Sequence, residues 1–235
     1  MAGKIFLLPI TLGESNPESV IPKEVIAKII SLRIFIVENV RTSRRFLRLL
    51  DKSFPIDDSI FYELNKHTKE SELTSFIAPI KKGQDIGIMS EAGVPGVADP
   101  GSNVVALAHR NNISVVPFVG PSSILLAVMA AGLNGQNFAF NGYLPLKSGE
   151  RIKKIKELEH RSKTENQSQL FIETPYRNMH MLNDIISCCQ PNTLLSIAVD
   201  ITLETEFIKT DSIKNWKNTK IDISKRPGIF TIHSY

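Results

Sequence analysis

The residues best suited to chemistry lie at positions 90–101, Ser-Glu-Ala-Gly-Val-Pro-Gly-Val-Ala-Asp-Pro-Gly, between an expected strand and an expected helix. In an open parallel sheet, ligands bind at the carboxyl ends of the strands, where such a segment lies. Its glycines accept unusual φ angles and allow close approach of the backbone, and its prolines stiffen the loop. The pattern is neither G-x-G-x-x-G nor G-x-x-x-x-G-K-[ST]. We therefore predict a ligand loop that binds through backbone groups; the alternative is a tight connection with no ligand.

Further polar loops follow other expected strands. Gly120-Pro-Ser-Ser123 enters a helix, where serine is also a common cap. Residues 141–145, Asn-Gly-Tyr-Leu-Pro, end an apolar strand. Glu173-Thr-Pro-Tyr-Arg177 places an acid, a phenol and a guanidinium on one turn, and an ion pair is the alternative to a binding role there. These loops are the second group of candidate ligand contacts.

The elements that position these loops change in character along the chain. Strands and helices alternate up to about residue 133, which indicates βαβ units and a mostly parallel sheet. One of these helices is expected at 71–82, closed by Gly83 in a left-handed conformation. Later, closely spaced strands at 194–202, 205–209 and 228–233 favour antiparallel pairing. We predict an α/β protein of two domains, a parallel one at 1–118 and one with a mixed sheet at 119–235.

Composition excludes several classes of protein. The chain has 235 residues, of which 42% are hydrophobic and 22% charged, so it is neither disordered, coiled-coil nor collagen-like. Its net charge of +4 permits an anionic partner without requiring one. The two cysteines, Cys188 and Cys189, are adjacent, which favours a reducing, cytoplasmic setting and no zinc site. No apolar run is long enough to span a membrane.

The same loops, in the same order, resemble motifs of the tetrapyrrole methylase superfamily of S-adenosylmethionine-dependent methyltransferases. They look most like the ribosomal RNA small subunit methyltransferase I family. Residues 91–101 match its Asp-Ala-Gly-Thr-Pro-Gly-x-Ser-Asp-Pro-Gly loop, and 119–122 match Pro-Gly-Pro-Ser. Residues 140–145 match Phe-x-Gly-Phe-Leu-Pro, 173–177 match Glu-Ser-Pro-His-Arg and 38–41 match Glu-Asp-Thr-Arg.

The resemblance implies a homodimer with S-adenosyl-L-methionine in the cleft between the two domains. It implies cofactor contacts from Gly93, Pro95, Val97, Asp99, Ser122, Ser123, Tyr143, Leu144, Pro227 and Gly228. Methyl transfer to a hydroxyl needs alignment and a nearby base, so the candidate catalytic residues are Glu91, then Glu38 and Glu173. Candidate RNA contacts are Arg41, Arg44 and Arg177, with Lys153 and Lys154 on a basic helix that begins near Arg151. No metal is needed.

Several positions depart from the family's motifs. Residues 8–14 replace a Thr-Pro-Ile-Gly-Asn loop, Asn39 and Val40 replace Asp and Thr, and Glu91 replaces Asp. Residues 199–203 lack the family's basic side chains. We expect a methyltransferase that modifies a ribose 2′-hydroxyl of small-subunit ribosomal RNA. The alternatives are methylation of a small molecule such as a tetrapyrrole, and a non-catalytic regulator that kept the cofactor site.

Overall fold

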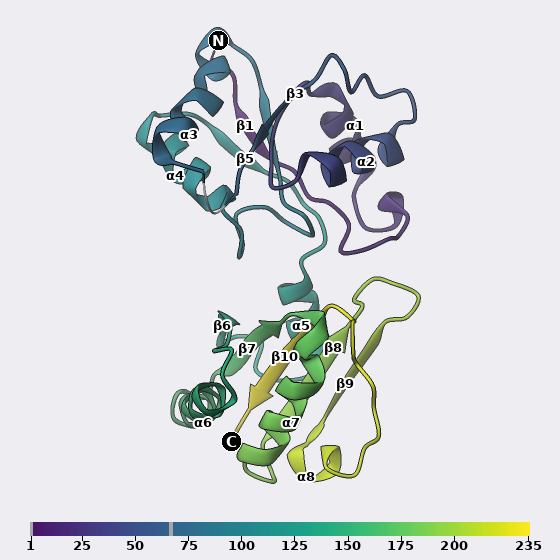
Figure 1. The fold of residues 1–235 in the computed structure, drawn as a ribbon, viewed down its shortest axis with the longest axis vertical. Coiled ribbons are helices and arrows are strands. Elements are labelled where there is room, and N and C mark those ends of the chain that lie inside the picture. The colour runs from purple at the N-terminus through teal and green to yellow at the C-terminus, as the bar shows by residue number, and fades with distance from the viewer. Residues whose placement is uncertain (1, 66–67) are drawn as a thin grey trace. The chain divides into compact units, whose positions relative to one another are not determined.

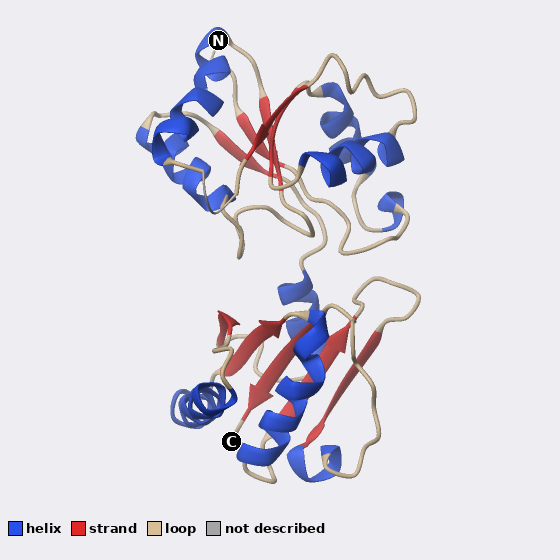
Figure 2. Ribbon diagram, in the orientation of Figure 1, coloured by secondary structure: helices blue, strands red, loops and turns tan. Residues whose placement is uncertain are grey.

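The computed structural model describes residues 2–65 and 68–235, and the chain divides into two compact units. The N-terminal unit is Met1–Ser122 and the C-terminal unit is Ser123–Tyr235. The domain boundary expected after Phe118 falls a few residues earlier than this division, because the chain from β5 to Ser122 stays with the first unit. Each unit is built around its own five-stranded sheet (Figure 2).

The N-terminal unit has an all-parallel sheet in the order β3-β2-β4-β1-β5, as the alternation of strands and helices predicts. Its strands are β1 (Ile5–Leu7), β2 (Ile34–Val37), β3 (Ile60–Glu63), β4 (Ile86–Met89) and β5 (Val115–Pro117). Its helices are α1 (Lys23–Ser31), α2 (Val40–Leu50), α3 (Glu70–Phe76) and α4 (Gly101–Arg110), with short 3-10 helices at Pro17–Ser19 and Ala78–Lys82.

The helices of this unit pack on opposite faces of the sheet. One apolar cluster joins α1 and α2 to one face, and a second joins α3 and α4 to the other (Figure 1). Every residue of β2 and β4 is buried, as expected for central strands covered on both sides. The loops after β2 and β4 therefore leave neighbouring strands toward opposite faces.

Local sequence explains where these helices begin and end. Pro22 precedes the first turn of α1, where its missing N–H costs nothing. The Asn39 side chain caps α2 by accepting hydrogen bonds from the N–H groups of Arg41 and Thr42. The helix expected at 71–82 is wrong as one element: it breaks after Phe76, and Pro79 lies in a separate 3-10 helix because proline cannot donate to a continuing helix.

The C-terminal unit has a mixed sheet in the order β6-β7-β10-β8-β9. Only β6 and β7 are parallel, and β10 pairs antiparallel with both β7 and β8, which confirms the antiparallel pairing expected for the later strands. Its strands are β6 (Phe138–Tyr143), β7 (Ser168–Glu173), β8 (Leu194–Val199), β9 (Phe207–Ser212) and β10 (Gly228–His233). Its helices are α5 (Ser123–Ala131), α6 (Ser148–Glu165), α7 (Asn178–Cys188) and α8 (Ile213–Trp216).

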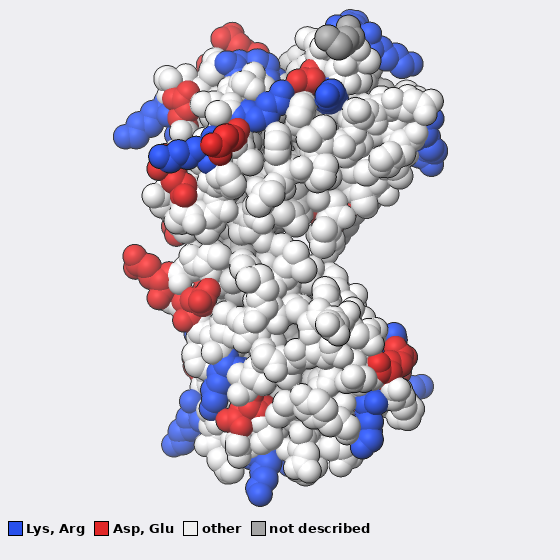
Figure 3. Space-filling model, turned by 180° about the vertical axis from the view of Figure 1, so that it is seen from behind, with Lys and Arg blue, Asp and Glu red and all other residues white. Residues whose placement is uncertain are grey.

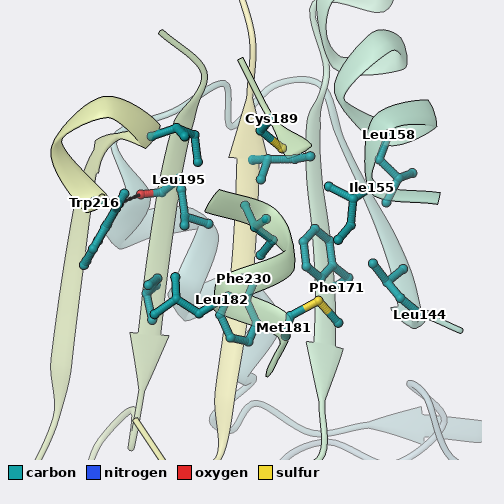
Figure 4. Packing of buried hydrophobic residues seen from close by; sticks show 14 of the residues in the cluster. Leu144, Ile155, Leu158, Phe171, Met181, Leu182, Cys189, Leu195, Trp216 and Phe230 are labelled. Carbon is teal, nitrogen blue, oxygen red and sulfur yellow. Dashed lines mark hydrogen bonds between the residues drawn. The ribbon is translucent and has the colours of Figure 1, made fainter. Parts of the chain in front are cut away.

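The core of the C-terminal unit lies where α6, α7 and α8 pack on one face of this sheet (Figure 4). Phe171 of β7 stacks on Phe230 of β10, with ring centroids 5.9 Å apart. Trp216 is buried, and its indole N–H donates to the Leu195 carbonyl at 2.9 Å. This indole is thus fixed both by packing and by a hydrogen bond.

The strand expected at 205–209 lies later, as β9, because a turn occupies the residues before it. Asp200 and Thr202 have positive φ angles of 51° and 73°. The Leu203 N–H donates to the Asp200 carbonyl, and the Glu206 N–H donates to the Leu203 carbonyl. No helix in residues 2–65 and 68–235 is long and apolar enough to cross a membrane.

Candidate functional site

The carboxyl edge of the N-terminal sheet brings two of the predicted catalytic acids together. Glu38 directly follows β2, and Glu91 lies in the loop after the neighbouring strand β4. The Glu91 N–H donates to Glu38 Oε2 at 3.2 Å. Because the loops after β2 and β4 run to opposite faces of the sheet, they leave space between them at this edge. Ligands usually bind at this position in an open parallel sheet.

Environment makes Glu38 a weaker acid than an ordinary glutamate. Burial raises the pKa of its carboxyl, and the negative charge of Asp99 raises this pKa further, against a lowering by the Glu91 N–H. Burial likewise raises the pKa of Asp99, although backbone N–H groups oppose that rise. A carboxyl with a raised pKa binds a proton more readily than an ordinary glutamate, which suits the role predicted for Glu38.

The side chain of Asp99 holds the shape of the loop by accepting hydrogen bonds from backbone N–H groups of that loop. Its Oδ2 accepts the Gly96 N–H at 2.7 Å, and its Oδ1 accepts the Gly101 N–H at 2.6 Å. Both carboxylate oxygens are therefore engaged within residues 96–101. Sequence reasoning placed Asp99 among the cofactor contacts, and this geometry gives it the further task of bracing the loop.

Two glycines of this loop have the left-handed backbone that glycine favours, in different surroundings. Gly93 has φ +73°, and a Cβ there would lie 3.1 Å from Leu12 Cδ2 and 3.2 Å from the Pro121 carbonyl oxygen. Gly96 has φ +85° with nothing within 4 Å of an added Cβ. A side chain at 93 would therefore be strained by its backbone angle and would have to displace its neighbours slightly, whereas the backbone at 96 faces open space. Of the other loop candidates, Pro95 is buried and Val97 is exposed.

A cavity of about 550 Å³ opens beside Glu91. Residues 10–15, after β1, form part of its wall. The remaining wall comes from α2 through Thr42, Arg45, Phe46 and Leu49. The sequence groups Arg45 with Arg44 and Arg48 as a basic cluster on this helix. It gives no sign that Leu49 lines a cavity, because only the fold places α2 against the β1 loop.

In the C-terminal unit, the predicted residues gather at one edge of its sheet. Gly228 pairs in register with Glu173 on one side and with Val199 on the other. Tyr143 pairs with Ile172 one strand further along. A Cβ at Gly228 would lie 2.7 Å from Val199 Cγ1, so the close strand packing requires glycine there.

The other cofactor candidates of this half have varied surroundings. Tyr143 is exposed at the end of β6, while the side chain of Leu144 is buried in the core of the unit, so only its backbone is available to a ligand. Ser123 opens α5, and Ser122 precedes it as the last residue of the N-terminal unit. Pro227 is exposed beside Gly228.

Buried Glu173 forms an ion pair with the partly exposed Arg177. Glu173 Oε1 accepts from Arg177 Nε at 3.0 Å, from its terminal nitrogen at 2.5 Å, and from the Thr174 N–H at 2.6 Å. The glutamate side chain is 1% exposed and the arginine 32%. This geometry makes Glu173 a residue that orients Arg177 at the sheet edge.

The basic residues fall into two groups. On α2, Arg41 and Arg44 are exposed, and the Arg44 guanidinium lies 5.2 Å from the centre of the Phe61 ring. On α6, Lys153 is exposed and Lys154 pairs with Glu157 at 2.6 Å. On the face shown in Figure 3, Lys and Arg side chains are scattered around each unit rather than gathered in one patch.

Arg151 does not belong to the exposed basic face expected for its helix. It is 4% exposed, and its Nε donates to Asp184 Oδ2 of α7 at 2.7 Å. Its guanidinium also donates to the Leu146 carbonyl at 2.8 Å. Helical spacing alone does not reveal that α7 supplies a carboxylate here. Across residues 2–65 and 68–235, no group of three or more His, Cys, Asp or Glu side chains is arranged to hold a metal ion.

Curated relatives share sequence along most of the chain. A Buchnera aphidicola (subsp. Schizaphis graminum) protein is 28% identical over 217 residues, covering 91% of this chain and 72% of its own length. An Escherichia coli O157:H7 protein is 31% identical over 164 residues, covering 70% of this chain and 56% of its own length. A Vibrio cholerae protein is 26% identical over 234 residues, covering 98% of this chain and 77% of its own length. Each of these is named ribosomal RNA small subunit methyltransferase I.

The chain is a homologue of the ribosomal RNA small subunit methyltransferase I proteins. It spans between 56% and 77% of the length of these three relatives. No protein-family model matches it.

Solved structures support the same fold. The methyltransferase CobJ superposes with a TM-score of 0.64 at 16% identity, covering 99% of this chain and 95% of its own. Cobalt precorrin-4 methyltransferase, CbiF, superposes with a TM-score of 0.59 at 12% identity, covering 98% of this chain and 94% of its own. This homologue of the methyltransferase I proteins thus has the α/β fold of CobJ and CbiF, and each relative and solved structure named above is a methyltransferase.

Proposed function

We propose that this protein transfers a methyl group from S-adenosyl-L-methionine to small-subunit ribosomal RNA, with a ribose 2′-hydroxyl as the acceptor. The observation that carries the proposal is the loop at 90–101, at the carboxyl edge of a parallel sheet, with Glu38 and Glu91 in contact there. The names of the curated homologues support the RNA substrate.

The residues present fit this cofactor. Gly96 and Gly142 both have left-handed φ angles and open space around an added Cβ, so a ligand can approach the backbone at each. Gly142 belongs to the 141–145 loop and Gly96 to the 90–101 loop. Backbone N–H and C=O groups suit a ligand that carries both an amino-acid and an adenosine moiety. When bound, the cofactor supplies an activated sulfonium methyl group.

The chain's own part in the reaction is to align the acceptor and receive its proton. Glu91 is exposed at the edge and borders the cavity, so its carboxylate is available to orient a hydroxyl. Glu38 accepts the Glu91 N–H and so holds the start of the loop. Its raised pKa supports a share in the proton-accepting role. We assign Arg177, which Glu173 orients, to phosphate binding, a role that suits a guanidinium.

Calorimetric titration with S-adenosylhomocysteine and methyl transfer to RNA from cells that lack this protein test the proposal. Glu91→Gln should preserve cofactor affinity and lower turnover by roughly 10²–10⁴-fold, while Glu91→Asp should lower it less. Equal turnover of wild type and Glu91→Gln would transfer the role to Glu38. Transfer to a tetrapyrrole but not to RNA would identify a small-molecule enzyme, and cofactor binding without any transfer would identify a regulator.

We further propose that the protein acts in the cytoplasm as a homodimer. The adjacent free cysteines, Cys188 and Cys189, are consistent with a reducing compartment. Light scattering coupled to gel filtration tests the oligomeric state, and a mass of one chain, 26.2 kDa, would contradict the dimer.

A further inference from the structure

The cavity beside Glu91 is larger than alignment of a single hydroxyl requires. Its volume of about 550 Å³ falls within the roughly 300–1,000 Å³ of pockets that bind small organic ligands. All of its lining residues belong to the N-terminal unit. The cavity is therefore a site that this unit forms by itself.

The α2 wall combines an apolar surface with a cation. Leu49 is 58% exposed, although the exposed residues around it on α2 are mainly polar or charged. Phe46 also lines the cavity and packs into the core, 7% exposed. Arg45 stands on the same wall with its guanidinium exposed. A flat base can lie on the apolar surface while a phosphate binds the guanidinium.

The charge of the cavity limits what it can hold. Glu14 and Glu91 both line it, against one arginine. A tetrapyrrole with several carboxylates would be repelled by this wall, because unpaired like charges at short range are costly. An RNA nucleotide carries a single negative charge on its phosphodiester, so these carboxylates repel it less, and Arg45 can pair with it.

Three departures from the family's motifs border the same place. Residues 10–14 and Glu91 line the cavity, and Asn39 caps α2, the helix that forms its other wall. The chain therefore differs from the family pattern mainly around this cavity in the N-terminal unit. Such clustering is expected where the acceptor is recognised.

We propose that this cavity binds the acceptor nucleotide of the RNA. Its base lies on Leu49 and Phe46, its phosphate binds Arg45, and its ribose hydroxyl faces Glu91. The proposal rests on the proposed function, since it assumes that RNA is the substrate. The acceptor must leave its stack to enter, which is easier in single-stranded RNA than in a duplex.

The test uses the full chain with S-adenosylhomocysteine or S-adenosylmethionine and small-subunit RNA from cells that lack the protein. Leu49→Trp fills the cavity, and Arg45→Gln removes its cation. Arg48→Gln is the matched control, because it makes the same charge change on α2 while Arg48 donates to the Lys52 carbonyl and does not line the cavity. RNA affinity is read by fluorescence anisotropy, methyl transfer by label, and cofactor affinity by calorimetry.

We expect Arg45→Gln to weaken RNA affinity and raise KM about 10-fold or more, the usual effect of losing one charged hydrogen bond. Leu49→Trp should abolish transfer with unchanged cofactor affinity, and Arg48→Gln should stay within about twofold of wild type. If Arg45→Gln and Leu49→Trp both bind RNA and transfer methyl groups as well as Arg48→Gln does, the proposed nucleotide site is overturned. The proposed function then remains intact. If the wild type transfers no methyl group to RNA, the proposed function fails, and RNA affinity measured by anisotropy then tests the cavity alone. Equal RNA affinity of Arg45→Gln, Leu49→Trp and Arg48→Gln, or no RNA binding by the wild type, would overturn the proposed nucleotide site.

Discussion

Removing the Asp184 carboxylate would leave a buried guanidinium without its partner. In the folded C-terminal unit, Asp184 of α7 bonds Arg151 of α6, whose side chain is 5% exposed against 15% for the aspartate. The same guanidinium donates to the carbonyl of Leu146, in the loop that follows the candidate contacts Tyr143 and Leu144. This ion pair therefore joins two helices and fixes a loop of the candidate site.

The expected cost follows from the burial of both partners. Breaking a buried pair by removing one member costs about 3–5 kcal/mol, because an uncompensated charge remains out of water. We expect Asp184→Ala to lower the free energy of unfolding of the C-terminal unit by that amount. Asp184→Asn keeps one acceptor oxygen and should cost less, about 1–3 kcal/mol. The double change Arg151→Met with Asp184→Leu should recover most of the loss.

Urea unfolding followed by tryptophan fluorescence measures this directly. Trp216, the single tryptophan of the chain, is 1% exposed in the core of the C-terminal unit, so its emission reports on that unit. Glu157→Ala is the matched control, because its pair with Lys154 on α6 is exposed and should contribute less than about 1 kcal/mol. A loss for Asp184→Ala no larger than that of the control would refute the reasoning.

Three further predictions concern the N-terminal unit. Gly93→Ala should lower its stability by about 1–3 kcal/mol in urea unfolding followed by circular dichroism, because a side chain at φ +73° is strained and would crowd Leu12. Glu38→Gln should raise the urea midpoint of unfolding at pH 7 and leave it unchanged below about pH 4. The pKa of Glu38 is raised in the folded state, so its ionisation as the pH rises destabilises that state, and glutamine does not ionise. A lower urea midpoint at pH 7 would contradict this. Asn39→Ala should cost about 1 kcal/mol in the same assay while Asn39→Asp costs little, since the side-chain oxygen caps α2.

Much of the fold could be predicted because local patterns dictate it. The uninterrupted apolar run at Ile34–Val37 indicates a central parallel strand, and it is buried throughout. Gly83 was expected to end its helix in a left-handed conformation, and it has φ +79°. Errors arose where neighbouring signals compete, as at Pro79, which divides an expected helix in two.

The sequence by itself identified the candidate ligand loops, because glycine, proline and acidic residues after apolar strands are local features. Only the tertiary structure decided which side chains meet. It places Glu38 against the Glu91 N–H, buries Arg151 on Asp184, and sets Leu49 beside the β1 loop. These contacts join residues far apart along the chain. The strand order and the helix packing that create them depend on burial of the whole core, which no short stretch of sequence specifies.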